Sequence, residues 1–272
     1  MMELKRVESY MEKIEESEKT TFTPVGEKLK VGLDLGTAYI VIVVLDEENN
    51  PIACEKQAAS VLRDGVVIDY TGASRIVKEL KEKLENRLGR ELLECAIAMP
   101  AGTEGSARTH QYVAEGAGFE VTNILDEPTA ANSIYQIENG VVVDIGGGTT
   151  GLAIIKNGEV VKTEDQPTGG THLSLVLAGN YKIPFSDAEA IKQDYSRHRD
   201  ILPVVKAVIE KMASIINRYI DKDSTDTIYL CGGTCCLTGI EKIIESETGI
   251  RTIKPQNPFL VTPAGIAMNC II

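Results

Sequence analysis

One short motif occurs twice in this chain, and it constrains the fold more than any other feature. An apolar run that ends in Asp, an aliphatic residue, Gly and Thr spans residues 29–37, and it returns with additional glycines at residues 140–150. Each copy is followed by a second apolar run and then by a turn. Two copies of this strand–turn–strand unit predict two related α/β halves, 29–138 and 139–272, whose hairpin tips meet at one cleft.

The residues at the two tips suit a phosphate group. Glycine lets the backbone approach a ligand, and the N–H groups freed at a tight tip form an anion-binding concavity. The tips supply Gly36, Thr37, Gly146, Gly147, Gly148 and Thr149. The first tip alone is also typical of an ordinary hairpin, whereas three consecutive glycines after a Val-rich strand contribute little to stability. Together the two tips predict phosphate binding.

Three carboxylates are predicted to face the same cleft and to act in catalysis. Asp34 and Asp144 end the two apolar strands, where they can hold a hard cation such as Mg²⁺, mostly through retained water. Glu127 follows a third predicted strand, 121–125, and can polarise an attacking water. The structural alternative is that Glu127 caps the helix starting at Pro128 or accepts backbone amides.

Apolar periodicity predicts the other elements. We expect helices at 72–88, 106–118, 172–177, 187–193, 203–220 and 262–267, and strands at 94–99 and 227–230. Glycine pairs adjoin two of them, Gly169 with Gly170 and Gly232 with Gly233. The second pair suits the close approach of a flat base or a sugar, although a plain strand-to-helix turn is the alternative.

Residues 1–28 form a separate predicted segment. Its apolar residues recur at helical spacing among charged ones, at Leu4, Val7, Met11 and Ile14. The pattern breaks at 20–26, which predicts an amphipathic helix followed by a linker. The apolar face either packs on its own domain, which the composition favours, or docks to a partner protein or shell.

Charge and composition exclude several classes of function. A net charge of −12 and a pI near 4.9 argue against a nucleic-acid partner, because phosphate backbones are bound by clustered Lys and Arg. The first 20 residues contain no uninterrupted apolar stretch, so we expect neither a secretory signal nor a membrane span. The expected location is the cytoplasm.

Cysteine spacing gives no framework for disulfides or metal. The six cysteines include no CxxC pair, so we expect reduced thiols. Cys231, Cys235 and Cys236 are close in sequence, but no histidine stands at metal-ligand spacing from them. Small buried residues are the favoured interpretation, and a metal site or a vicinal bridge is the alternative.

The order of motifs resembles that of a known superfamily. DLGT at 34–37, DEPTAA at 126–131, DIGGGT at 144–149, LCGGT at 230–234 and PAGIA at 263–267 are similar to the phosphate-1, connect-1, phosphate-2, adenosine and connect-2 motifs of the actin-like ATPases. This resemblance, from Leu29 to the C-terminus, implies duplicated ribonuclease-H-like domains around a central nucleotide cleft. Within the superfamily, the chain looks most similar to a chaperone-like branch associated with ethanolamine utilisation and bacterial microcompartments.

The resemblance implies a cofactor and a role for each motif residue. Asp34 and Asp144 would organise Mg²⁺ for ATP or ADP, the tip residues would contact phosphates, and Glu127 would position water. Residues 188–192 are similar to a chaperone-type segment that brackets adenosine, so Glu189 and Lys192 join Gly232 and Gly233 at the base. The implied partners are an enzyme of the ethanolamine pathway or a microcompartment shell protein, with the N-terminal helix as a docking element.

Departures from the superfamily limit the functional prediction. The catalytic lysine of the chaperone ATPases has no motif-matched counterpart, the segments between motifs are short, and the end at Ile272 leaves no room for a peptide-binding domain. We therefore expect a slowly hydrolysing nucleotide switch. The alternatives are a non-enzymatic scaffold or filament-like subunit and a small-molecule kinase of the same fold, which would need longer walls around its acceptor.

Overall fold

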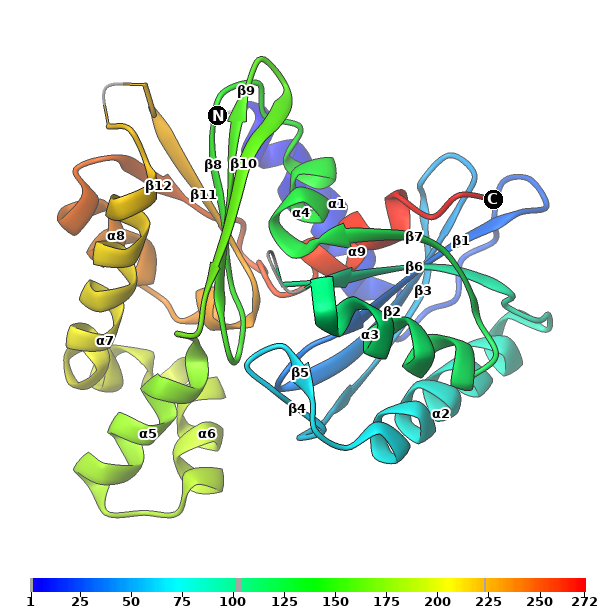
Figure 1. Ribbon diagram of the computed structural model, residues 1–272, viewed down its shortest axis with the longest axis horizontal. Coiled ribbons are helices and arrows are strands. Elements are labelled where there is room, and N and C mark those ends of the chain that lie inside the picture. Colours follow the sequence, from blue (N-terminus) through cyan, green and yellow to red (C-terminus); the bar gives the residue numbers. More distant parts are fainter. Residues whose placement is uncertain (1, 101–103, 223) are drawn as a thin grey trace.

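Two five-stranded sheets with the same strand order form the molecule in the computed structural model, which describes residues 2–100, 104–222 and 224–272 (Figure 1). The orders are β3-β2-β1-β6-β7 and β10-β9-β8-β11-β12. In each sheet the first three strands along the chain are antiparallel neighbours, and the last two run parallel to the first strand. The predicted duplication of an α/β unit is confirmed.

The first sheet is buried on both faces. Its strands are β1 (Leu29–Leu35), β2 (Tyr39–Asp46), β3 (Pro51–Ala58), β6 (Glu94–Met99) and β7 (Glu120–Asp126). Alternate residues of β2 face opposite ways: Ile40, Ile42 and Val44 join the core under the helices α2 (Tyr70–Leu88) and α3 (Glu104–Gly116). Val41 and Val43 pack on the other side, in a core shared with the second half.

Local capping explains why the 72–88 helix was predictable to within two residues. The carboxylate of Asp69 accepts a hydrogen bond from the N–H of Gly72 at 2.9 Å, which satisfies a free donor of the first turn of α2. Gly89 ends the helix with φ of 67°, a left-handed conformation that glycine adopts without strain. A small hairpin of β4 (Leu62–Arg63) and β5 (Val66–Val67) precedes this helix.

The helices of the second half lie to the left of and below the second sheet in Figure 1. Its strands are β8 (Gly140–Ile145), β9 (Thr150–Lys156), β10 (Glu159–Gln166), β11 (Thr227–Cys231) and β12 (Arg251–Ile253). The helices are α5 (Gly170–Tyr181), α6 (Phe185–Gln193), α7 (His198–Tyr219) and α8 (Ile240–Thr248), with 3₁₀ turns at Tyr195–Arg197 and Gly233–Cys236.

The predicted start of the long helix at Pro203 is wrong. Proline favours the first helical position, but the α7 helix already begins at His198. Pro203 lies inside the helix, where it removes one backbone hydrogen bond. Burial of Ile201, Val205 and Ile209 on one face holds the helix across this position.

Two helices cross between the halves. The C-terminal helix α9 (Val261–Met268) returns to pack on β1 and β2 of the first sheet, and α4 (Glu127–Tyr135) packs on α9 and on β8 and β9 of the second. A Cβ on Gly265 would lie 2.0 Å from the carbonyl oxygen of Ala130, so these helices touch through their backbones. The two sheets are thereby joined at the floor of the cleft.

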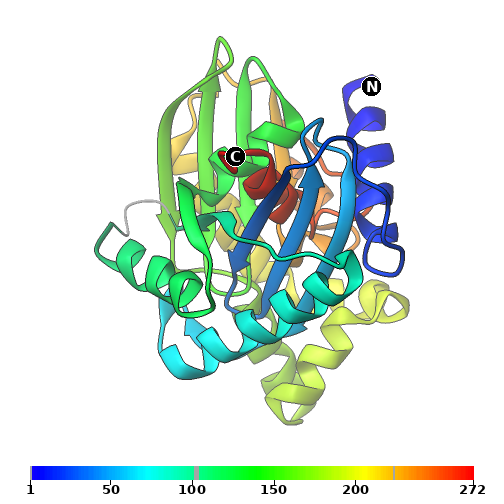
Figure 2. The ribbon, with the colours of Figure 1, turned by 90° about the vertical axis from the view of Figure 1, so that its right-hand side faces the viewer.

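The N-terminal helix α1 (Met2–Glu16) packs on its own chain. Val7, Met11 and Ile14 are buried in the core that the two halves share. The Arg6 guanidinium donates to the carbonyls of Ile134, at 2.8 Å, and Tyr135, at 3.1 Å, at the end of α4. Figure 2 shows α1 in dark blue alongside β3. The apolar face of α1 is therefore occupied within the molecule, as the first of the two alternatives for this segment predicts.

Candidate functional site

The tips of two hairpins, one from each sheet, face each other. The same backbone hydrogen bond closes both: the N–H of Gly36 donates to the carbonyl of Tyr39, and that of Gly146 to the carbonyl of Thr149, each at 3.0 Å. A Cβ on Gly148 would lie 2.8 Å from Oγ1 of Thr37. The repeated motif has thus folded into repeated geometry, and the lack of a side chain at Gly148 lets the second tip approach the Thr37 side chain of the first.

A cleft with a volume of about 370 Å³ lies between the halves at these tips. Most of the residues predicted from the motifs line it, namely Asp34, Gly36, Thr37, Glu127, Asp144, Gly146, Gly147, Gly148, Thr149, Glu189, Lys192, Gly232 and Gly233. Elements that lie far apart in the sequence therefore converge on one space.

Gly169 and Gly170 are not among the lining residues. The N–H of Gly170 donates to the carbonyl of Gly146 at 2.9 Å, and a Cβ on Gly169 would lie 2.7 Å from the carbonyl oxygen of Gly147. This glycine pair therefore packs the N-terminus of α5 against the second tip from behind. Its position suits support of the phosphate cradle, and direct contact of this pair with a ligand stays a prediction.

Three carboxylates form the floor of the cleft near the tips. Asp34 lies in β1, Asp144 in β8, and Glu127 is the first residue of α4. Burial, together with the charge of Asp144, raises the pKa of Asp34 to about 7. The pKa of Glu127 is raised well above its usual range by burial and by the neighbouring charges of Asp144 and Asp34. Such mutual repulsion is typical of a site that receives a cation.

The cap of α4 bears on one of the structural interpretations of Glu127. Asp126 caps this helix, because its carboxylate accepts from the N–H of Thr129 at 2.9 Å and from the Thr129 hydroxyl at 2.7 Å. Glu127 is therefore not needed as the N-cap, and it lines the cleft.

Two hydroxyl groups that the motif analysis did not assign support this floor. Thr262, at the start of α9, donates a short hydrogen bond to Asp144. Thr234 donates to the carbonyl of Gly146 at 2.7 Å and fixes the second tip. Both threonines stand within or beside motifs that were recognised, at 230–234 and 263–267, but their partners depend on tertiary contacts.

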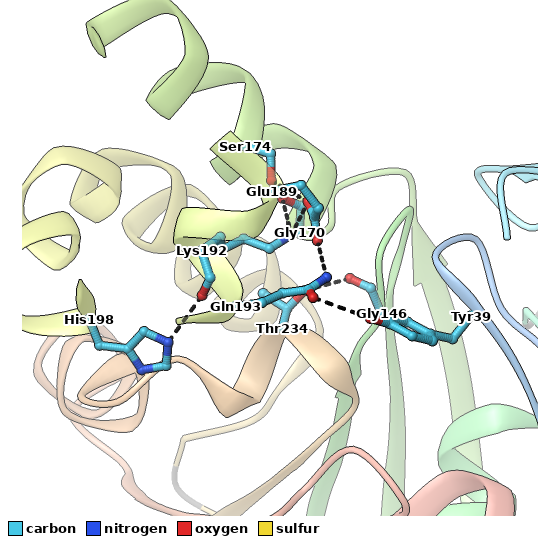
Figure 3. A network of polar contacts seen from close by, with 9 residues as sticks. All are labelled: Tyr39, Gly146, Gly170, Ser174, Glu189, Lys192, Gln193, His198 and Thr234. Atoms are coloured by element: carbon cyan, nitrogen blue, oxygen red, sulfur yellow. Dashed lines mark hydrogen bonds and ion pairs between the residues drawn. The ribbon is translucent and has the colours of Figure 1, made fainter. Parts of the chain in front are cut away.

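A polar network from α5 and α6 forms a second region of the cleft (Figure 3). The Lys192 ammonium donates to the carboxylate of Glu189 at 2.8 Å and to the carbonyl of Gly170 at 3.1 Å. Ser174 also donates to Glu189, at 2.6 Å. Lys192 lowers the pKa of Glu189 against the opposing effect of burial. The pair is therefore ionised and held in place beside the glycine tip.

Aromatic side chains that sequence reasoning missed also line the cleft. Tyr39 and Phe259 make an edge-to-face contact, with ring centroids 5.4 Å apart and planes at 73°. Tyr195 lies in the 3₁₀ turn after α6 and also faces this space. A flat base needs such surfaces, but isolated aromatic residues carried no sequence signal.

The described residues include no group of three or more His, Cys, Asp or Glu side chains able to hold a metal by themselves. Mg²⁺ commonly keeps several waters and takes one or two carboxylates plus phosphate oxygens. Asp34 and Asp144 beside a glycine cradle fit that pattern. All six cysteines are free. Cys231 and Cys235 are buried, as the favoured interpretation of this cluster predicts, whereas Cys236 is half-buried and lines the cleft. None of the described helices is long and apolar enough to cross a membrane.

One family model and several known proteins match this sequence. The family model of Type IV pilus assembly protein PilM matches residues 111–264. Ethanolamine utilization protein EutJ of Escherichia coli (strain K12) is 41% identical over 242 residues, covering 89% of this chain and 86% of the relative.

Solved structures match the same two kinds of protein, EutJ and PilM. The crystal structure of ethanolamine utilization protein EutJ from Carboxydothermus hydrogenoformans matches with a TM-score of 0.90 at 47% identity, covering 97% of this chain and 98% of the other. A chain of a PilM-PilN type IV pilus biogenesis complex shares the fold, with a TM-score of 0.73 at 14% identity over 90% of this chain and 98% of the other.

Proposed function

Because this chain belongs to the EutJ family and, with PilM-type proteins, to the actin-like ATPase superfamily, we propose that it is a chaperone-like, ATP-dependent switch of ethanolamine utilisation. One observation carries the proposal: two glycine tips, each closed by the same backbone hydrogen bond, face each other above a floor of mutually repelling carboxylates. This arrangement suits a polyphosphate with its cation and would be destabilising without one.

The cleft offers separate regions for the two ends of a nucleotide. The tips supply N–H groups for the phosphates, and Thr37 and Thr149 supply hydroxyls. Lys192 and Glu189, with Gly232 and Gly233 opposite them, are the candidates for the adenosine end. Asp34 and Asp144 would hold Mg²⁺ through water. When bound, Mg²⁺ would neutralise phosphate charge and relieve the repulsion among these carboxylates.

The arrangement of the charged groups favours slow hydrolysis. Glu127 is placed to orient water, but its raised pKa makes it a poor base near neutral pH until a cation lowers that pKa. Among the described residues lining the cleft, the lysines are Lys56 and Lys192. Lys56 pairs with Glu18 at 2.6 Å and Lys192 with Glu189 at 2.8 Å. Neither is placed as an independent phosphate-stabilising cation, so we propose switching as the main role.

The switch would act on a partner protein in the cytoplasm. The names of the relatives support a partner within ethanolamine utilisation, for which an enzyme of that pathway is the first candidate. The resemblance of the motifs adds a shell protein of a bacterial microcompartment as the second candidate. Closure of the two halves on ATP and their release after hydrolysis would change the surface offered to it. A scaffold that binds nucleotide without turnover is the second candidate, and the lysine pairs described above favour it over a kinase.

Calorimetric titration with ATP, ADP and GTP, with and without Mg²⁺, tests the proposal, followed by phosphate release on the same sample. We expect Mg²⁺-dependent binding of adenine nucleotides with slow release. Binding without release would indicate the scaffold, and no binding would refute the nucleotide site.

Asp144→Asn provides the site-specific test. It should reduce the Mg²⁺-dependent affinity about tenfold or more, whereas Asp187→Asn, which removes an exposed carboxylate on α6, should not. Equal affinity of the Asp144 variant and the unaltered protein would remove Asp144 from the proposed magnesium site.

A further inference from the structure

Three strands of the second sheet bring an additional carboxylate, Asp165, toward the phosphate end of the cleft. The register pairs Asp144 of β8 with Gly151 of β9, and Gly151 with Asp165 of β10. Residues paired across antiparallel strands point to the same face of the sheet. Asp144 and Asp165 therefore share one face, and Gly151 leaves the space between them free of a side chain.

The Asp165 carboxylate occupies part of that space. A Cβ on Gly151 would lie 3.3 Å from Oδ1 of Asp165 and 3.4 Å from Cδ of Pro128. The carboxylate thus lies over the glycine and beside the start of α4, next to Glu127. A side chain at Gly151 would compete with it, so the glycine and the aspartate are matched across the two strands.

One oxygen of this carboxylate lacks a partner. Oδ1 of Asp165 is buried and accepts no hydrogen bond from any residue that the structure describes. The side chain of Thr149, in the glycine tip, lies close enough to lower the pKa of Asp165 by hydrogen bonding, although burial outweighs this effect. A buried carboxylate oxygen without a donor is costly, so a bound water or ion is the expected partner.

The spacing distinguishes an inner ligand from an outer one. Neighbouring strands lie about 4.8 Å apart, so the backbones of Asp144 and Asp165 are separated by about 10 Å. A bare Mg²⁺ needs oxygens at about 2.0–2.1 Å and would draw both carboxylates together. A hydrated ion can instead be hydrogen-bonded from both sides at this spacing, through its waters.

On the premise of the proposed function, we propose that Asp165 is a positioning residue of the phosphate site. Its carboxylate orients the Thr149 hydroxyl and, across Gly151 from Asp144, accepts hydrogen bonds from the water shell of nucleotide-bound Mg²⁺. The electrostatic coupling of Asp165 to both Glu127 and Asp144 agrees with this placement.

The test compares Asp165→Asn with Glu164→Gln in ADP titrations, with Mg²⁺ and with a chelator. Glu164 is the adjacent residue on β10, so its side chain points to the other face, and it pairs with Lys162 at 3.2 Å. Its variant removes the same charge from the same strand. We expect Asp165→Asn to lower the affinity for ADP with Mg²⁺ about tenfold, with the chelator-treated affinity unchanged and Glu164→Gln equal to the unaltered protein.

A carboxylate moved across the strands separates positioning from a structural role. In Asp165→Ala combined with Gly151→Asp, the acid is supplied from β9 into the space that Asp165 vacates. We expect this double variant to recover most of the Mg²⁺-dependent affinity that Asp165→Ala loses. An equal loss of affinity with and without Mg²⁺, or no recovery in the double variant, would show that Asp165 only stabilises the structure of β10.

The result for the unaltered protein separates the two proposals. If it binds ADP with no dependence on Mg²⁺, the proposed function fails and the role of Asp165 falls with it. If it shows the dependence and Asp165→Asn retains it in full, only the role of Asp165 is overturned.

Discussion

Burial, together with the charge of Asp144, raises the pKa of Asp34, and this shift makes the stability of the nucleotide-free protein depend on pH. The pKa of Asp34 is about 7 in the folded protein, against 3.8 for the ordinary group. Between these values the folded state binds more protons than the unfolded state, so stability falls as pH rises and the loss is complete above about pH 7. His198, whose pKa burial lowers, contributes with the opposite sign at the acid end.

The variant Asp34→Asn measures the contribution of this carboxylate separately from that of opposing groups such as His198. The variant should melt at a higher temperature than the unaltered protein, and the difference should grow from pH 5 to pH 8 because asparagine never ionises. Thermal unfolding across this range, without nucleotide or Mg²⁺, provides the measurement. A constant difference, or one that shrinks toward pH 8, would show that Asp34 ionises freely.

Gly148 tests whether the second tip must lie against the first half. A Cβ there would lie 2.9 Å from Cα and 3.0 Å from the nitrogen of Asp64, both backbone atoms that cannot rotate away. Asp64 lies in the turn between β4 and β5, so Gly148→Ala should push the second tip away from this turn and from Thr37 of the first tip, at about 1–3 kcal/mol, and weaken nucleotide binding about tenfold. Gly179→Ala is the control, since no atom lies within 4 Å of its Cβ position in α5. Calorimetry that gave both variants the same affinity would show that nucleotide binding does not require close contact of Gly148 with the first half.

Local residue patterns identified the cleft better than they identified its supports. Gly36 and Gly146 were predictable because each belongs to a contiguous motif whose backbone role is local. Thr262 and Asp165 were not, because each acts through another strand or helix. The partner of Thr262, Asp144, is 118 positions away, and Asp165 acts through the register of three strands. Neither the hydrogen bond of Thr262 nor the strand register of Asp165 can be read from spacing in the sequence.

At the scale of elements, α1 is predicted to contribute to stability through its apolar face. Met11 is 2% exposed and packs in the core shared by both halves. Met11→Ala should therefore lower the free energy of unfolding by about 2–5 kcal/mol, and urea denaturation measures the change. Glu12→Ala, at the next and exposed position of the same helix, should change it by less than about 0.5 kcal/mol. Equal effects would mean that the helix detaches before the core unfolds.

Element boundaries were predictable where a side chain or glycine acts locally on the helix end. Asp69 and Gly89 bound the α2 helix within two positions of the prediction. Pro203 misled the prediction of α7, because packing of its buried face outweighs the one hydrogen bond that the proline removes. Tertiary packing, which periodicity reports only indirectly, decided that boundary.

For the whole molecule, the duplicated motif predicted two facing halves but not how they are joined. The α4 and α9 helices cross the division of the chain and contact through Gly265 and Ala130. This crossing places Thr262 beneath Asp144 and Glu127 beneath the tips, so the floor of the cleft is also the connection between the halves. Movement of the halves would therefore act directly on the carboxylates.

One hydrogen bond spans the mouth of the cleft: the Tyr39 hydroxyl, from β2, donates to Oε1 of Gln193, at the end of α6, at 3.2 Å (Figure 3). The Gln193 amide in turn donates to Glu189 at 2.9 Å, which ties the contact to the candidate base site. Tyr39→Phe keeps the ring against Phe259 but removes the donor, at about 1 kcal/mol.

The halves of the Tyr39→Phe variant should separate more readily, so dissociation of a fluorescent ADP analogue should accelerate about fivefold in stopped flow. Tyr10→Phe is the matched control, since the Tyr10 hydroxyl donates to the carbonyl of Asn49 at 2.7 Å, on the side of the first half that α1 covers. That variant loses a hydrogen bond of the same kind without touching the cleft. Equal dissociation rates in the two variants would mean that closure rests on the tips and the crossed helices alone, because the contact at the mouth would then add nothing to the lifetime of the closed state.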